Sequence, residues 1–299
     1  MEKRIHIFIA LGITTILFIL GSFYDEAISQ ELYIENFTFG IIISAFGLVL
    51  TYSVSAMFAG LLLGEALKLQ NKKLKIIISI CTALFLLVII YLCGDTVFDE
   101  NGFNKKGFGY KALGIGIFAI ILPIFYYLGF RQSKKITNDK LWLILSIIII
   151  GAVIALLAGA LGIKEIFHRP RFRTVVKESE GIEFHKWWVP FKDYKNYITA
   201  DITKEEFKSF PSGHATTSMI AVLGLSYLFL FDPRLKKYQT YLFYLGVTYS
   251  YFISLTRILA GAHFLSDVAC GSIISLVFFF ITNEIIIRKK LLEDNINIE

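Results

Sequence analysis

Long apolar runs recur along the whole chain and are separated by short polar connections. A membrane-spanning helix needs about 20 consecutive apolar residues, and mostly apolar stretches of about that length occur eight times. The predicted spans lie near residues 5–23, 38–66, 75–93, 111–130, 141–162, 213–231, 240–258 and 266–287. The expected fold class is therefore all-α, a polytopic transmembrane helical bundle of about eight spans.

The first span begins after Lys3 and Arg4, as a secretory signal peptide would. Its apolar run is long for a signal peptide, and the acidic residues from Asp25 onward follow without a convincing small-residue cleavage site. We therefore expect this segment to be retained as a span.

Composition agrees with a membrane protein. Of the 299 residues, 56% are hydrophobic and 18% are charged, with a mean hydropathy of +0.64, whereas soluble domains carry about 25% charged residues. A soluble globular enzyme is thus disfavoured. The formal net charge is +6, but the basic residues form short clusters between apolar runs, which indicates membrane topology and no nucleic-acid partner.

The distribution of lysine and arginine predicts the orientation. Sixteen basic residues lie at the two ends of the chain and in alternate connections, which are the residues around 3–4, 68–75, 131–140, 234–237 and 288–290. Cytoplasmic loops carry this excess, so both termini are expected in the cytoplasm. The long connection 163–212 also carries ten basic residues and falls on the outer side, which is tolerated because long loops cross largely regardless of charge.

Three polar groups stand at predicted span ends on that outer side. One follows the fifth span, from Lys164 to Arg173; a second, Pro211-Ser212-Gly213-His214, opens the sixth; a third, from Thr256 to Asp267, turns between the last two spans. Ionisable residues near or within the membrane are expensive and by default mark function. These groups are the candidate site.

The cations and the helix start of this candidate site suit an anion. Lys164, Arg171 and Arg257 offer the fork and point-charge geometries that match phosphoryl oxygens. The free N–H groups at a helix start, here after Ser212, also accept an anion, and Gly213 allows the backbone to approach closely.

The histidines and the acid suit nucleophilic chemistry. His263 and Asp267 are four residues apart and would share one helix face, so the carboxylate could fix the imidazole tautomer and leave the other ring nitrogen free to attack. His214 supplies a second imidazole for proton donation. Taken singly, each residue is more often a structural histidine, a snorkelling cation or an ordinary helix start; their conjunction favours a site.

At these residues the sequence resembles the membrane branch of the type 2 phosphatidic acid phosphatase superfamily. Its pattern is Lys, six residues, Arg-Pro; then Pro-Ser-Gly-His; then Ser-Arg, five residues, His, three residues, Asp. The spacings are kept, but Phe172 stands at the proline position, Thr256 at the serine position, and a shifted Arg169-Pro170 pair lies two residues before Phe172. The phosphate ligand of the first motif is therefore either Arg169 or Arg171.

The resemblance implies metal-independent phosphoryl transfer without a cofactor. It makes His263 the nucleophile, Asp267 its orienting acid and His214 the proton donor. The phosphate-binding residues that it implies are Lys164, Arg171, Ser212, Gly213 and Arg257. The implied substrate is a lipid phosphate or polyprenyl pyrophosphate, bound at the outer face of a bacterial cytoplasmic membrane.

The resemblance covers roughly residues 150–285, the last four spans. We expect a phosphatase core at 141–290, with the outer loop 163–212, and additional N-terminal helices at 1–140 whose role the sequence leaves open. The same residues would also serve a phosphotransferase with a hydroxyl acceptor. A non-enzymatic anion or lipid transporter is the other class, although it gives the spacing of His263 and Asp267 no purpose. Neither the lipid nor the oligomeric state follows from the sequence.

Overall fold

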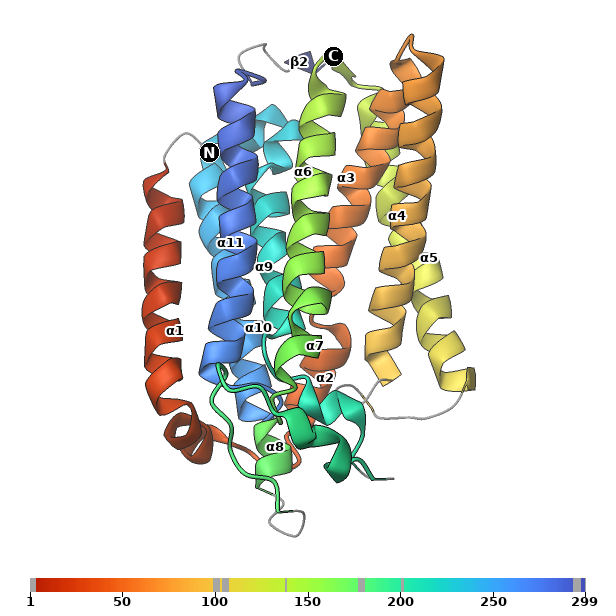
Figure 1. The fold of residues 1–299 in the computed structure, drawn as a ribbon. Coiled ribbons are helices and arrows are strands. Elements are labelled where there is room, and N and C mark those ends of the chain that lie inside the picture. The colour runs from red at the N-terminus through yellow and green to blue at the C-terminus, as the bar shows by residue number, and fades with distance from the viewer. Residues whose placement is uncertain are drawn as a thin grey trace.

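The fold is an all-helical bundle whose long helices run side by side (Figure 1). The computed structural model describes residues 4–98, 103, 108–137, 139–176, 181–199, 202–292 and 297–298. The long helices are α1 (Ile5–Leu32), α3 (Val49–Lys68), α4 (Lys72–Phe98), α5 (Phe108–Ser133), α6 (Leu141–Leu156), α9 (Gly213–Ser226), α10 (Gln239–Leu259) and α11 (Leu265–Arg288). In a bilayer such runs must be helical, because a helix satisfies its own backbone hydrogen bonds.

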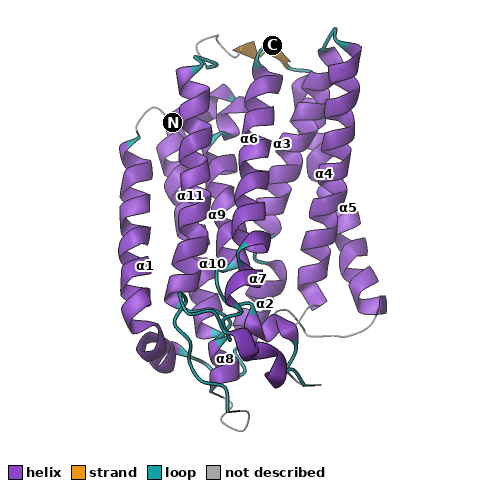
Figure 2. Cartoon of the chain, in the orientation of Figure 1, coloured by secondary structure: helices purple, strands orange, loops and turns teal. Residues whose placement is uncertain are grey.

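Shorter elements join the long helices. They are α2 (Thr38–Phe46), the π-helical turn η1 (Leu157–Gly162), α7 (Lys164–Phe167), α8 (Phe172–Val175), and the 3₁₀ turns η3 (Lys192–Tyr197), η4 (Lys204–Phe207), η5 (Leu228–Leu230) and η6 (Pro233–Tyr238). The two-residue strands β1 (Ile136–Thr137) and β2 (Asn297–Ile298) pair antiparallel. Loops and short turns gather at the end of the bundle that carries α7 and α8 (Figure 2).

Seven segments in the described residues have the length and hydropathy to cross a membrane, so the protein is an integral membrane protein. Two details differ from the sequence pattern. The apolar run at 38–66 is broken near Gly47 into α2 and α3, and the run at 213–231 forms α9, only 14 residues long, followed by η5. At 1.5 Å per residue α9 is shorter than the hydrocarbon core of a bilayer.

Two apolar clusters hold the helices together. The larger one joins side chains of α1, α3, α6, α9, α10 and α11 and includes Ile78 of α4. The second joins α2, α3, α4 and α5 and includes Ile253 of α10. Helix α1 packs along α11, and α9 packs between α10 and α11. The last helices therefore surround α9, whose first residues lie at the loop-rich end.

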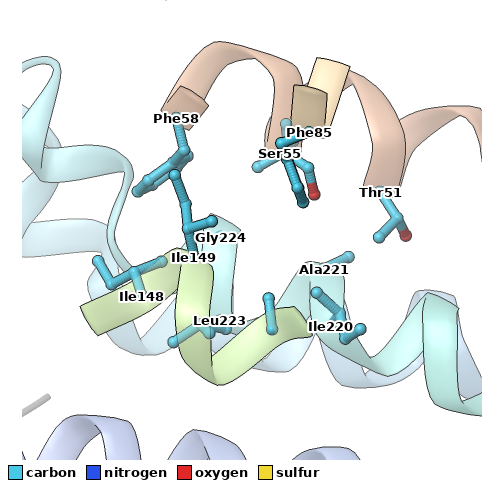
Figure 3. Close-up of a pocket in the computed structure, with 12 residues that line it drawn as sticks. Thr51, Ser55, Phe58, Phe85, Ile148, Ile149, Ile220, Ala221, Leu223 and Gly224 are labelled. Carbon is cyan, nitrogen blue, oxygen red and sulfur yellow. The ribbon is translucent and has the colours of Figure 1, made fainter. Parts of the chain in front are cut away.

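Between α3, α4, α6 and α9 there is a small gap with a volume of about 20 Å³. Its walls are mostly apolar, with Phe58, Ile148 and Leu223 among them (Figure 3). This volume holds about one water molecule, so the gap cannot accept a phosphate group.

Both ends of the chain lie at one end of the bundle, and α7, α8 and the loop before α9 lie at the other (Figure 1). Together with the clusters of basic residues, this arrangement predicts that the loop-rich end faces outward. In intact cells, Lys195→Cys should react with an impermeant thiol reagent and Lys236→Cys should not. Both lysines are exposed, so accessibility across the membrane decides the result, and the opposite labelling pattern would invert the topology.

Candidate active site

The three polar groups of the sequence come together at the loop-rich end of the bundle. Lys164 begins α7, directly after η1, and Arg171 caps α8. Arg257 lies in the last turn of α10. Isolated π-helical turns often mark functional sites, and here η1 widens the chain immediately before Lys164.

His263 lies in the tight turn between α10 and α11, only 2% exposed. Gly261 permits this turn because its φ is +62°, a backbone conformation that suits glycine. The ring atom Nδ1 of His263 lies 2.8 Å from the carbonyl oxygen of Ser209. Since a carbonyl can only accept, Nδ1 carries the proton and the lone pair of the neutral ring is on Nε2.

The surroundings keep His263 neutral. Burial, together with the positive charges of Lys164 and Arg171 and only partly opposed by Asp267, lowers its pKa to about 3. A neutral imidazole is the form that can act as a nucleophile.

Asp267 stands in the first turn of α11 and is fully buried. Its Oδ2 accepts hydrogen bonds from the hydroxyl of Ser209 at 2.5 Å and from the backbone N–H of Phe264 at 2.8 Å, which also caps the start of the helix. The distance from Oδ2 to His263 Nδ1 is 3.8 Å, too long for a hydrogen bond. Ser209 therefore joins the acid to the imidazole: its hydroxyl binds Asp267 and its carbonyl orients His263.

The two arginines of the first motif have different partners. Arg169 is 1% exposed and donates from Nη1 to Asp267 at 2.6 Å and to Ser266 at 2.9 Å, and from Nη2 to Asp25 at 2.9 Å. Its guanidinium also lies 3.9 Å from the ring centre of Phe264. Arg169 is thus paired with the two carboxylates Asp25 and Asp267. Arg171, which keeps the motif spacing from Lys164, is the candidate phosphate ligand.

The start of α9 forms as expected and approaches α11 closely. Ser212 caps the helix by accepting from the N–H of Ala215 at 3.3 Å, and its own N–H donates to the carbonyl of Asp267 at 3.0 Å. In this cap the Ser212 hydroxyl oxygen accepts a hydrogen bond, so its O–H group can still donate one to a different acceptor. Gly213 is the first residue of the helix and His214 the second.

His214 is nearly buried, and α2 contacts its ring. Nε2 lies 3.3 Å from both the hydroxyl and the carbonyl oxygen of Ser44. His214 also interacts electrostatically with Arg257, His263 and Lys164, so both histidines and the cations belong to one cluster.

The loop 163–212 is tied to this cluster by backbone and side-chain bonds. Arg171 N donates to Glu206 O at 2.9 Å, and the Glu206 carboxylate pairs with Arg173 and accepts from Thr174 at 2.6 Å. Burial raises the pKa of Glu206, but Arg171, Arg173 and the Thr174 hydroxyl outweigh it and hold the pKa at about 2. Glu206 is therefore ionised at neutral pH and fixes the segment that carries Arg171.

The donors gathered here are suited to an anion. In the part of the chain that the structure describes, no three His, Cys, Asp or Glu side chains cluster as a metal site would require. Lys164, Arg171, Arg257 and the start of α9 instead surround the histidines with positive charge. This is the environment that binds a phosphoryl group.

A family model described as the PAP2 superfamily matches residues 139–290. The chain belongs to the PAP2 superfamily. Membership supports a phosphatase-type function, because this superfamily generally comprises phosphatases and phosphoesterases. No curated protein and no solved structure matches the chain. The matched region contains every candidate site residue, whereas Ser44 and Asp25 lie outside it.

Three residues of the site were not predicted. Ser209 lies two residues before the Pro-Ser-Gly-His motif and nothing in the sequence pattern distinguishes it. Ser44 is one of several serines in apolar helices. Asp25 did carry a signal, since a carboxylate near the end of a membrane helix is costly unless it is paired or functional.

Lysine substitutions should separate the two arginines while keeping their charge. Arg171→Lys should weaken binding of inorganic phosphate about tenfold, because the forked hydrogen bonds are lost. Arg169→Lys should lower the melting temperature and kcat, with phosphate affinity within about threefold of the wild type. Calorimetric titration with phosphate and thermal melting measure both effects, and the reverse pattern would exchange the two roles.

Proposed function

We propose that the protein is an integral membrane phosphatase that hydrolyses a lipid phosphate or pyrophosphate at the outer membrane face through a phosphohistidine on His263. The observation that carries the proposal is the contact between Nδ1 of this histidine and the carbonyl oxygen of Ser209, which lie 2.8 Å apart. Because the carbonyl can only accept, Nδ1 carries the proton and the nucleophilic lone pair is on Nε2.

In the first step, His263 Nε2 attacks phosphorus and the bond from phosphorus to the lipid oxygen breaks. Lys164, Arg171 and Arg257, with the Ser212 hydroxyl and the Gly213 N–H, neutralise the charge on the equatorial oxygens. Such preorganised charge stabilisation supplies most of the catalysis in phosphoryl transfer.

His214 gives the leaving oxygen its proton in that step, and Ser44 of α2 positions its ring. In the second step, water gives a proton to His214 and attacks the phosphohistidine, the bond from phosphorus to Nε2 breaks, and inorganic phosphate leaves. Asp267, 3.8 Å from the ring, stabilises the imidazolium charge that exists between the steps.

The position of the site supports a lipid substrate. It lies at the end of membrane-length helices and beside the aromatic rings of Phe167, Trp187 and Phe210, which pack against one another. Aromatic residues of this kind prefer the boundary between water and lipid, where a lipid headgroup presents its phosphate.

Release of phosphate by the purified protein tests the activity. Phosphatidic acid, phosphatidylglycerol phosphate, a polyprenyl pyrophosphate and a lipid A phosphate make up the panel, because each presents a phosphomonoester or pyrophosphate. Phosphate release from at least one of them is expected. Transfer of the phosphoryl group to an added alcohol instead of water would indicate a phosphotransferase, and no turnover with any of them would contradict an enzymatic role.

The charge of the site predicts how the activity responds to metal removal and to a phosphate mimic. Because cationic side chains surround the phosphate position, hydrolysis should persist in excess EDTA, and vanadate, which mimics five-coordinate phosphorus, should block it. His263→Ala should abolish turnover. His6→Ala is the matched control, since His6 lies near the other end of the bundle against Tyr244; a strict requirement for magnesium would refute the site assignment.

The two histidines should differ in their dependence on the leaving group. General acid catalysis contributes about 10²–10⁴-fold where the departing oxygen needs a proton, and a nitrophenolate leaves readily without one. His214→Ala should therefore keep a much larger fraction of its activity on p-nitrophenyl phosphate than on a lipid phosphate, whereas His263→Ala should be inactive on both. The comparison is made under conditions in which phosphoenzyme formation limits the rate. If His214→Ala lost the same fraction of activity on both substrates, His214 would act in binding or in the second step instead.

A further inference from the structure

A buried carboxylate from the first helix reaches the active-site cluster. Asp25 lies near the end of α1, outside the region 139–290 that defines the family, and is only 3% exposed. Its Oδ2 accepts from Arg169 Nη2 at 2.9 Å and from the hydroxyl of Ser266, and its Oδ1 accepts from the Ser266 N–H at 2.9 Å. Asp25 thus binds both the arginine that holds Asp267 and the residue next to Asp267.

Helix α1 is fitted to this position. Gly21, one turn before Asp25, faces the beginning of α11 so closely that an added Cβ would lie 2.9 Å from Ser266 Cα. Real side chains do not tolerate such contacts, so glycine allows the two backbones to approach at the level where Asp25 enters the site. The close packing of α1 on α11 at Gly21 and the hydrogen bonds of Asp25 therefore occur in the same turn of α1.

A continuous chain of bonds links Asp25 to the nucleophile. Asp25 binds Arg169, Arg169 donates to Asp267 at 2.6 Å, Ser209 donates to Asp267 at 2.5 Å, and the Ser209 carbonyl holds His263 at 2.8 Å. Each member is buried. Without Asp25, the guanidinium would have one carboxylate partner instead of two, and the first turn of α11 would lose two hydrogen bonds.

We propose that Asp25 is a positioning residue of the phosphatase centre, which fixes Asp267 through Arg169 and Ser266 and thereby fixes the orientation and tautomer of His263. The proposal rests on the proposed function for its kinetic consequence. Helix α1 is then a part of the active enzyme and not only a membrane anchor.

A purely structural ion pair is the competing explanation, because breaking a buried pair is destabilising whatever its role. The two explanations differ in what else changes. Asp25 does not touch the phosphate-binding cations, so a positioning role predicts a fall in kcat with little change in phosphate affinity, whereas a general loosening of the site weakens both.

The kinetic test compares Asp25→Asn with Glu26→Gln, an exposed carboxylate on the same helix. Asp25→Asn should lower kcat on a lipid phosphate about 10- to 100-fold, the range found when hydrogen-bonded partners of metal ligands are removed. The inhibition constant of inorganic phosphate for Asp25→Asn should stay within threefold of the wild-type value. For Glu26→Gln, both kcat and this inhibition constant should stay within twofold of the wild type. Asp25→Glu should recover part of the kcat that Asp25→Asn loses. An unchanged kcat, or equal losses in kcat and phosphate affinity, would overturn the proposal.

A spectroscopic test does not depend on turnover. The ¹⁵N spectrum of histidine-labelled protein, with His263 assigned by the loss of its signal in His263→Gln, reports which ring nitrogen carries the proton. The wild type should show Nδ1–H alone, and Asp25→Asn should show a mixture of both tautomers. A pure Nδ1–H tautomer in the variant would overturn the proposal even if the wild type hydrolysed no lipid phosphate, a result that would refute the proposed function separately.

If Asp25→Asn does not fold, as judged by gel filtration and melting, Ser266→Ala tests the same connection. This change removes only one hydroxyl, which donates to Asp25 and accepts from Arg169 at 2.9 Å. Ser266→Ala should lower kcat, as Asp25→Asn does, and its spectrum should show both tautomers of His263. Wild-type behaviour in both measurements would overturn the proposal.

Discussion

The rest of the site depends on how the bundle accommodates one buried guanidinium. Arg169 is almost fully enclosed and is shared between Asp25 and Asp267. Removing charges from water is costly, and only good geometry with complete hydrogen bonding compensates for it. Three segments far apart in the sequence must therefore meet at fixed distances: the end of α1, the loop after α7 and the start of α11. His263 and the candidate phosphate-binding cations lie on the same or adjoining segments. The packing that satisfies Arg169 therefore also sets the geometry of the catalytic cluster.

The arrangement also divides the charged residues by task. Arg169 is bound to carboxylates of the protein, and Glu206 tethers the segment around Arg173. Lys164 and Arg257 interact electrostatically with His214, so a bound anion would lie near both the cations and the histidine. Arg169 balances two buried carboxylates, whereas Lys164, Arg171 and Arg257 are the proposed phosphate-binding cations. The arginine that holds the helix ends together and the cations that would hold phosphate are therefore different side chains.

Much of this could be predicted from the sequence, because the strongest signals are local. Apolar runs of membrane length indicated the long helices, and the fixed spacings of Lys164 to Arg171 and of Arg257, His263 and Asp267 indicated the site and the family. The break between α2 and α3 escaped prediction because both sides of Gly47 are apolar, and periodicity cannot mark a kink inside a continuous hydrophobic run. The choice between Arg169 and Arg171 was also beyond the sequence, since it depends on which guanidinium meets carboxylates from distant helices.

Ser209 shows most clearly why spacing alone could not complete the site. His263 and Asp267 are four positions apart, which suggested a direct bond between them on one helix face. The helix begins only at Leu265, however, so His263 lies in the turn before it and the periodicity of the helix does not apply to the pair. A serine from the loop before α9 fills the gap, with its hydroxyl on the acid and its carbonyl on the imidazole. The carbonyl is the more selective partner of the two: a carboxylate accepts a hydrogen bond when it is ionised but can donate one when it is protonated, whereas an amide oxygen only accepts. Holding Nδ1 with a backbone group therefore fixes the tautomer as long as Asp267 keeps Ser209 in place, and leaves that carboxylate to balance the charge that forms on the ring during the reaction.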